Sequence, residues 1–197
     1  MAHNAPVSWS PDGEWLVFID RTVADPTVTE LFVRRFSAGS GNGGQQITFG
    51  SERVLFPAWS PTGEWIVFVR SVPGAPMQLW KVRPDGTDLQ RFDATPTGQL
   101  MPTWAPDGRS LAYLGIDGLR VTQVDGSGSV RIRPDLSFVE IDFAPDGRSL
   151  VAIQFLGACQ RAVVRIDLIS QIVTPLTSPM GSCTTTVDVP AYPAWGN

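Results

Sequence analysis

Histidine is almost absent from this sequence, and so are the motifs that mark common catalytic sites. The single histidine, His3, lies close to the N-terminus, where we expect no regular structure. It therefore offers no base for a Ser-His-Asp triad and no set of ligands for a histidine-rich metal site. The sequence also contains no Gly-x-Ser-x-Gly elbow and no Gly-rich phosphate loop followed by Lys-Ser/Thr. We predict a protein that is not an enzyme and that holds no metal and no cofactor.

Basic clusters and long apolar runs are missing as well. Fifteen Lys and Arg are set against 19 Asp and Glu, and no basic run is longer than Arg34-Arg35. A nucleic-acid-binding surface needs a basic face, so we expect no nucleic-acid partner. No apolar stretch approaches the ~20 residues of a membrane span. The N-terminal residues also lack the charged-then-apolar pattern of a secretion signal.

Glycine and proline are abundant, with 19 and 17 residues spread along the chain, and 43% of the residues are hydrophobic. Distributed turn residues between apolar segments are typical of many short strands joined by tight turns. No window of useful length shows helical periodicity. The fold class indicated is all-β.

An internal repeat gives the architecture. Its copies are VSWSPDGEWLVF at 7–18, PAWSPTGEWIVF at 57–68, PTWAPDGRSLAY at 102–113, IDFAPDGRSLVA at 141–152, and the half copy PAWGN at 193–197. The aromatic anchors are Trp9, Trp59, Trp104, Phe143 and Trp195, spaced by 50, 45, 39 and 52 residues. A period of about 40–45 residues built from strands is typical of a β-propeller blade.

Each copy predicts a strand, a turn and a second strand. Proline presets the first central residue of the turn, and glycine takes the position with positive φ. The repeated turn residues are Asp12, Gly13, Gly63, Asp107, Gly108, Asp146 and Gly147, with Thr62 in place of aspartate in the second copy. We expect these aspartates to accept backbone hydrogen bonds within their turns rather than to bind calcium or act as catalytic acids.

A second hairpin follows in every copy, which makes four strands per repeat. We predict blades at about 6–50, 55–96, 101–134 and 139–178, and an extra innermost strand at 190–195. The apolar runs after the turns are nearly continuous, as in strands covered on both faces. We expect the anchor aromatics to pack between blades. Trp15 and Trp65 have no counterpart at Ser110 and Ser149, but the core is favoured for them too.

These repeats resemble those of TolB-like β-propellers, whose SPDG blades also occur in the propeller of prolyl-oligopeptidase-type enzymes. The resemblance covers the chain from Pro6 to Trp195. It implies a propeller, and a periplasmic or extracellular location. Such propellers usually have six or more blades, so we expect four blades and one extra strand to be part of a larger propeller. The alternative is a compact four-bladed ring.

The two cysteines, Cys159 and Cys183, fall in loops that the blade topology places on the same face of the same blade. We predict a disulfide that closes a loop of 183 − 159 = 24 residues. The alternative is two free, partly buried thiols.

Binding remains the best hypothesis for function, since loops on a rigid scaffold commonly carry it. The loops that enter the innermost strands place four polar or amphipathic side chains at one channel mouth: Arg53, Gln99, Glu140 and Tyr192. The favoured partner is another protein or a domain of the same parent chain.

Two other hypotheses remain open. The chain could be the accessory propeller of a prolyl-oligopeptidase-like hydrolase whose catalytic domain is absent from it. A polysaccharide lyase, as in oligogalacturonate-lyase-like propellers, is disfavoured because such enzymes need several metal-ligating histidines.

Overall fold

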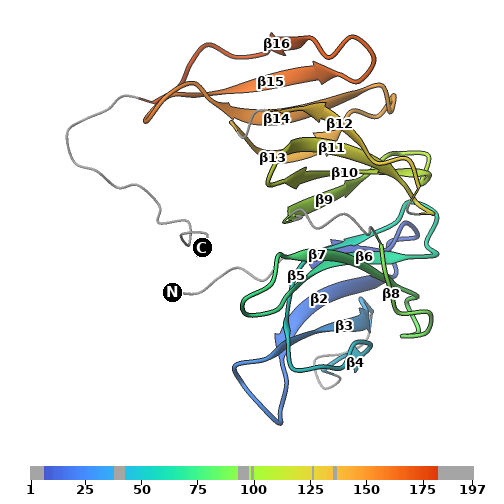
Figure 1. The fold of residues 1–197 in the computed structure, drawn as a ribbon. Coiled ribbons are helices and arrows are strands. Elements are labelled where there is room, and N and C mark those ends of the chain that lie inside the picture. Colours follow the sequence, from blue (N-terminus) through green and yellow to red (C-terminus); the bar gives the residue numbers. More distant parts are fainter. Residues whose placement is uncertain are drawn as a thin grey trace.

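The computed structural model describes residues 7–37, 43–92, 98, 100–125, 127–134 and 137–181, and the regular structure there is β throughout. Four four-stranded antiparallel units follow one another along the chain, as the repeat predicts, and a single bridge joins the first two into one eight-stranded sheet (Figure 1). Each unit is called a sheet below. The first sheet contains β1 (Val7–Trp9), β2 (Trp15–Arg21), β3 (Thr29–Arg35) and β4 (Gln45–Gln46). The second contains β5 (Arg53–Trp59), β6 (Ile66–Ser71), β7 (Gln78–Val82) and β8 (Gln90–Arg91).

The third and fourth sheets repeat this order. The third sheet contains β9 (Leu100–Trp104), β10 (Ser110–Gly115), β11 (Gly118–Gln123) and β12 (Val130–Arg133). The fourth contains β13 (Phe138–Phe143), β14 (Ser149–Phe155), β15 (Arg161–Asp167) and β16 (Val173–Pro175). One parallel pair, Thr29 with Arg53, links the first sheet to the second.

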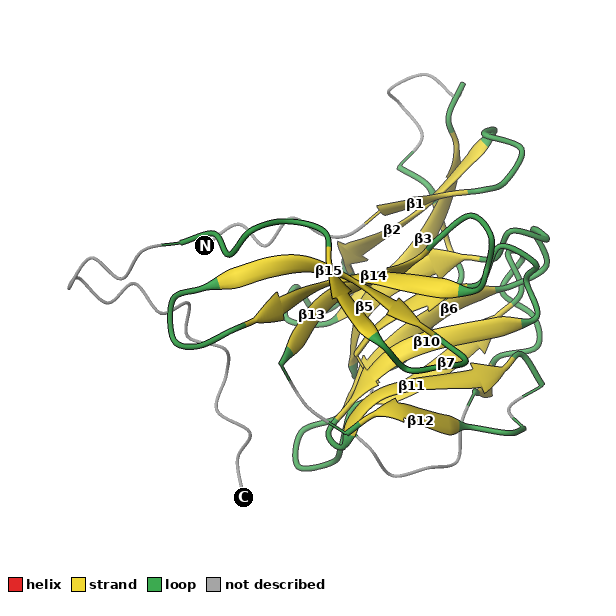
Figure 2. Cartoon of the chain, turned by 90° about the horizontal axis from the view of Figure 1, so that it is seen from above, coloured by secondary structure: helices red, strands yellow, loops and turns green. Residues whose placement is uncertain are grey.

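The sheets stack face to face in chain order, and the first and fourth lie at opposite ends of the stack (Figure 1). The first strands of the sheets, β1, β5, β9 and β13, contact one another in series and form the inner side of the arc. Figure 2 views the arc from above, and the strands of successive sheets fan out there as blades do. The described residues form no helix that could cross a membrane.

The repeated turn explains why each sheet begins as it does. The amide of Gly13 donates to the carbonyl of Ser10 at 3.0 Å, and Gly13 has a φ of 71°. Only glycine adopts this conformation without steric cost. The carboxylate of Asp12 accepts from the amide of Glu14 at 2.9 Å, and Asp107 and Asp146 accept from the amides two residues ahead at the same distance. The turn therefore closes locally, before any contact between sheets is made.

The core lies between sheets rather than within one. Val17 and Leu31 pack against Phe68 in the first interface, and Val67 packs with Tyr113 in the second. The third interface joins a set from the third sheet to a set from the fourth: Ala112, Leu119 and Ile132 with Leu150, Ala152, Val164 and Ile166. The central sheets are covered on both faces, which is why the run Ile66–Val69 is fully buried and continuously apolar.

The structure departs from the sequence prediction at one anchor and at Trp15, which is 38% exposed and not in the core. Trp104 is 8% exposed and Trp59 and Phe143 are half-buried, but Trp9 is 49% exposed. Trp9 lies on the end sheet, so no earlier sheet in the described chain packs on it. The predicted extra strand at 190–195, with Trp195, lies outside the described residues.

Candidate binding pocket

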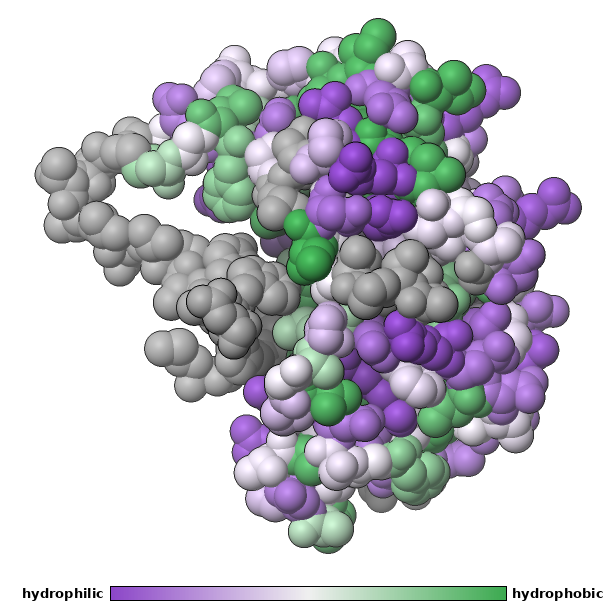
Figure 3. All heavy atoms as spheres, viewed as in Figure 1, coloured by the Kyte–Doolittle hydropathy of each residue, from purple (hydrophilic) through white to green (hydrophobic). Residues whose placement is uncertain are grey.

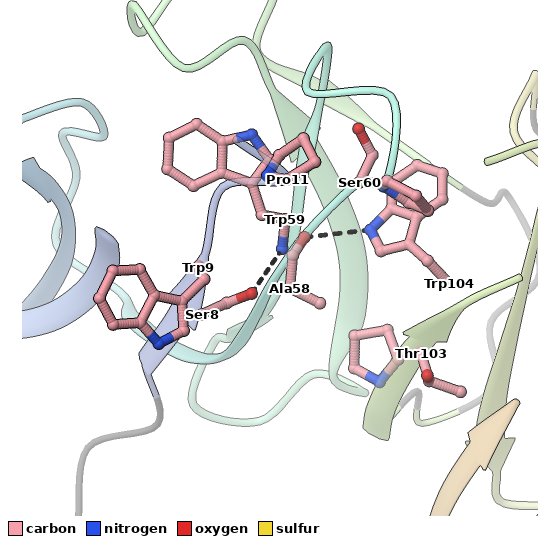
Figure 4. Close-up of a pocket in the computed structure, with 10 residues that line it drawn as sticks. Ser8, Trp9, Pro11, Ala58, Trp59, Ser60, Thr103 and Trp104 are labelled. Atoms are coloured by element: carbon pink, nitrogen blue, oxygen red, sulfur yellow. Dashed lines mark hydrogen bonds between the residues drawn. The ribbon is translucent and has the colours of Figure 1, made fainter. Parts of the chain in front are cut away.

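An open pocket lies on the inner side of the first three sheets, where their first strands run into the repeated turns. Its volume is about 310 Å³. We call it the tryptophan pocket, and its lining residues are Ser8, Trp9, Pro11, Ala58, Trp59, Ser60, Pro61, Pro102, Thr103 and Trp104. Figure 4 shows Trp9 on one side of the pocket, Trp104 and Thr103 on the other, and Trp59 between them.

Hydrogen bonds between sheets hold the pocket walls in place. The Ser8 hydroxyl accepts from the amide of Trp59 at 3.0 Å, and the indole N–H of Trp104 donates to the carbonyl of Ala58 at 3.1 Å (Figure 4). The indole N–H of Trp59 donates to Gly63 at 3.3 Å. The bonds made by Ser8 and Trp104 join three consecutive sheets, so the pocket is fixed by the stack and not by one loop.

The lining carries no ionisable side chain. Outside the lining, the carboxylate of Asp142 accepts from the Thr103 hydroxyl at 2.7 Å. The hydroxyl of Ser60 lies 3.1 Å from that of Thr62 and accepts from the amide of Trp65. The pocket therefore offers aromatic and proline surface to a ligand, beside polar atoms that remain accessible. Such a surface suits stacking and apolar contact rather than proton transfer.

Two of the four predicted channel-mouth residues are described: Arg53 lies at the start of β5 and Glu140 lies within β13. Arg53 begins β5, while the tryptophan pocket starts at the far end of that strand. Arg53 and Glu140 are both exposed, and no contact between them is found in the described part of the chain. Gln99 and Tyr192 lie outside the described residues. These four residues therefore stay a prediction.

A backbone feature of the inner strands could not be read from composition. Phe56, Met101 and Glu140 have φ values of 52°, 52° and 50°, each three residues before an anchor aromatic. In all three sheets the pairing with the next strand shifts register at this place, which marks a β-bulge. A non-glycine residue at positive φ is uncommon, and bulges re-aim side chains next to functional surfaces. In the sequence, the position of the bulge is marked by its constant distance of three residues before the anchor aromatic.

Acidic residues do not gather into a metal site. Among the described residues no group of three or more His, Cys, Asp or Glu side chains is placed to hold a metal ion. Asp107 and Asp146 line a second hollow of about 370 Å³ between the third and fourth sheets, but their carboxylates already accept backbone amides. In the first turn, the hydrogen bonds from Ser10 and Glu14 lower the pKa of Asp12.

A charged cluster lies between the first two sheets. The Arg70 guanidinium is 3.2 Å from the carboxylate of Glu52 and 4.8 Å from the Trp80 ring. Burial raises the pKa of Glu30, against the opposing effects of the Thr48 hydroxyl and of Arg70. Thr48 donates to Glu30 and accepts from the amide of Leu31. The electrostatic effect of Arg70 on Glu30 acts between the two sheets, at the end away from the tryptophan pocket.

One of the two cysteines is described. Cys159 is disulfide-bonded, and Cys183 lies outside the described residues. Arg161 and Met180 exchange two backbone hydrogen bonds, of 3.0 and 2.8 Å. This bridge brings the chain after β16 back beside Cys159. The pairing of Cys159 with Cys183 stays a prediction, with the backbone path in its favour.

Comparisons with known proteins give the fold. No protein-family model matches the chain, and no curated protein sequence does. TolB from Acinetobacter baumannii matches with a TM-score of 0.71 and 16% identity, over 90% of this chain and 45% of that one. A putative TolB from Agrobacterium tumefaciens matches with a TM-score of 0.72 and 18% identity, over 88% and 61%.

A third similar structure is a puromycin-hydrolysing peptidase from Mycobacterium tuberculosis, with a TM-score of 0.69 and 20% identity. That match covers 88% of this chain and 29% of the peptidase. The chain thus spans about half the length of the TolB structures and less of the peptidase. The architecture predicted from the repeat is confirmed: this chain has the all-β fold of the TolB β-propellers.

Proposed function

We propose that this chain is a non-catalytic propeller module that binds an extended segment of another protein on the inner side of its arc. The tryptophan pocket carries the proposal. It is built from three consecutive sheets, its volume is in the range of ligand pockets, and aromatic and proline side chains dominate its lining. Aromatic-lined grooves are a recurrent way to hold extended peptides, because rigid rings give contact area at low entropic cost.

The absence of ionisable groups from the lining supports binding over catalysis. General acid–base chemistry needs a titratable group within hydrogen-bond reach of the reacting atoms. The lining hydroxyl of Ser8 accepts from Trp59, and that of Thr103 donates to Asp142. A ligand would therefore gain affinity from stacking on Trp9 and from the exposed prolines Pro11 and Pro61.

The test is selection of ligands from a random peptide library displayed on phage, with the purified chain immobilised. We expect enriched peptides whose affinity falls at least about tenfold when Pro61 is changed to arginine, since a long charged side chain would then replace proline surface in the lining. Pro145→Arg is the matched control. Pro145 has the same turn position in the fourth sheet, is exposed, and does not line the tryptophan pocket. Equal binding by both variants, or no enriched peptides, would contradict the proposal.

A second candidate is the accessory propeller of a peptidase-type hydrolase. The similarity to the puromycin-hydrolysing peptidase favours it, since that protein contains a propeller of this fold within a much longer chain. Sequencing the genomic DNA beyond codon 197 tests it. A following domain with a Gly-x-Ser-x-Gly elbow would support the accessory role. A stop codon would contradict it.

A further inference from the structure

The outer face of the first sheet is apolar and only partly covered. The strand register places Val7 opposite Phe18 and Trp9 opposite Leu16, and Phe18 opposite Phe32 on the next strand. Val7 is 55% exposed and Trp9 is 49% exposed. Two aromatic pairs lie along this face: Trp9 with Phe36 at 4.8 Å and Phe18 with Phe32 at 5.9 Å between ring centroids. We call this set of residues the leading face.

The other three sheets show what an equivalent face normally does. The repeat aligns Leu16 and Phe18 with one pair in each later sheet: Ile66 and Phe68, Leu111 and Tyr113, and Leu150 and Ala152. Each of these six side chains is at most 1% exposed. Each pair packs against the sheet that precedes it. The leading face therefore has the chemistry of a blade face whose covering blade is not among the described sheets.

The covering faces also repeat. Val17 and Leu31 cover the second sheet, Val67 and Leu79 cover the third, and Ala112 and Leu119 cover the fourth. In the fourth sheet the register places Ile153 opposite Val163 and Val151 opposite Arg165 on the corresponding face. Val151, Ile153 and Val163 are half-buried and Arg165 is exposed. We call this second set the trailing face.

The trailing face also carries a cation, Arg165, at a position that makes a hydrogen bond between sheets elsewhere in the chain. In the second sheet the position equivalent to Arg165 is Lys81, since Lys81 lies opposite Val67 as Arg165 lies opposite Val151. Lys81 donates to the carbonyl of Val124 in the next sheet at 2.9 Å. Phe36 is the residue of the first sheet that corresponds to Val124 in the third. The amide of Val124 donates to the carbonyl of Arg109, and the amide of Phe36 donates to the carbonyl of Glu14, which has the same position in the repeated turn. By analogy with Lys81 and Val124, Arg165 on a trailing face would donate to the carbonyl of Phe36 on the leading face that packs against it.

We propose that a second copy of this chain docks its trailing face on the leading face, and that two copies join head to tail. Each copy carries one leading face and one trailing face. When these faces meet, they would make the same kinds of contact as the three interfaces between sheets inside one chain. Two copies of four sheets give eight, within the usual 4–8 blades of propellers. A two-fold axis would then make both junctions equivalent and close the ring. This inference does not require the peptide-binding function proposed above, but the two share one residue, since Trp9 lines the tryptophan pocket and also lies on the leading face.

Light scattering behind size exclusion tests it on the intact chain. We expect a mass of about 43 kDa, twice the 21.4 kDa of one chain. Phe18→Arg damages the leading face and Val163→Arg damages the trailing face, so each variant alone should run as a monomer. A mixture of the two should recover a dimer, because one of its two junctions combines an intact leading face with an intact trailing face.

The controls use exposed apolar residues away from both faces. Val23→Arg, in the loop after β2, and Ile169→Arg, in the turn after β15, should stay dimeric. Circular dichroism would confirm that the arginine variants fold. Arg165→Ala changes an exposed residue and should weaken dimerisation about tenfold, as expected for one charged hydrogen bond.

Three outcomes would overturn the proposal. A monomer of the natural sequence at high micromolar concentration would show that another kind of blade or partner covers the leading face. A dimer that Phe18→Arg breaks and Val163→Arg does not would show that leading faces pair with each other. Failure of the mixed variants to associate, with both folded, would exclude the head-to-tail arrangement.

Discussion

The ammonium of Lys81 in the second sheet donates a 2.9 Å hydrogen bond to the carbonyl oxygen of Val124 in the third. The same ammonium lies 4.7 Å from the centre of the Trp65 ring and 5.3 Å from that of Phe92. Only 8% of Lys81 is exposed. The hydrogen bond of this cation joins the second blade to the third, while both of its aromatic contacts lie within the second blade.

Lys81→Ala should lower the free energy of unfolding by about 2 kcal/mol, because the buried stem of the side chain and its hydrogen bond to Val124 are lost together. Urea denaturation followed by tryptophan fluorescence measures it. Lys81→Met keeps the apolar stem and should cost less. A loss within error for the alanine variant would mean that desolvation of the ammonium cancels its contacts.

Burial lowers the pKa of Lys81, and this gives a pH dependence with a defined sign. Between the lowered pKa and the ordinary value of 10.5, the unfolded chain binds more protons at this site than the folded chain does. The contribution of Lys81 to stability should therefore rise with pH across that window. We expect wild type to gain stability relative to Lys81→Met between neutral pH and pH 10. A constant difference would contradict the assignment.

Glu30 gives a pH dependence with the opposite sign. Burial raises its pKa above 4.5, so between 4.5 and the raised value the folded chain holds more protons than the unfolded chain. Stability from this site is then lost as the pH rises through the window. Glu30→Gln should become more stable relative to wild type on going from pH 4 to pH 7. Urea denaturation at both pH values measures the change, with the exposed Glu64→Gln as the control.

The second copy of the turn has Thr62 where the other three copies have aspartate, and this difference suggests a stabilising substitution. Thr62 accepts from the amide of Glu64 at 3.4 Å, against 2.9 Å for the aspartates at the other three positions. Thr62→Asp should shorten this bond and raise the melting temperature by roughly 1–2 °C. Calorimetry measures the shift. The same change at Thr87, which lies outside the repeated turn, should not raise it.

The disulfide predicted between Cys159 and Cys183 should contribute about 3 kcal/mol, by closing a loop of 24 residues in the unfolded chain. Cys159→Ser tests the size of the loss. Thiol titration of the unreduced, unfolded protein tests the bond itself, and two reactive thiols would exclude it. Gly181→Ala should also disfavour formation of the disulfide, because Gly181 has a φ of +107° and an added Cβ would meet the Cys159 carbonyl oxygen.

The sequence alone determined the repeat, the turns and the four strands of each blade. These features depend on local chemistry: proline and glycine in the turn, the aspartate that accepts the next amide, and apolar runs of strand length. Such signals act over a few residues, so they could be read without a structure. The outermost strands were less well placed. The sequence indicated a fourth strand in each blade without its bounds, and β8 spans only Gln90–Arg91, because its pairing depends on one neighbour.

Only the tertiary structure decided what each repeated residue does. Trp9 and Trp104 occupy the same place in the motif, yet one is 49% exposed and the other 8%. Their difference comes from the stack, since burial of a blade face requires a second blade on it. The tryptophan pocket likewise needs three sheets side by side. Burial of Lys81 also requires the next sheet, because its acceptor at Val124 is 43 residues away.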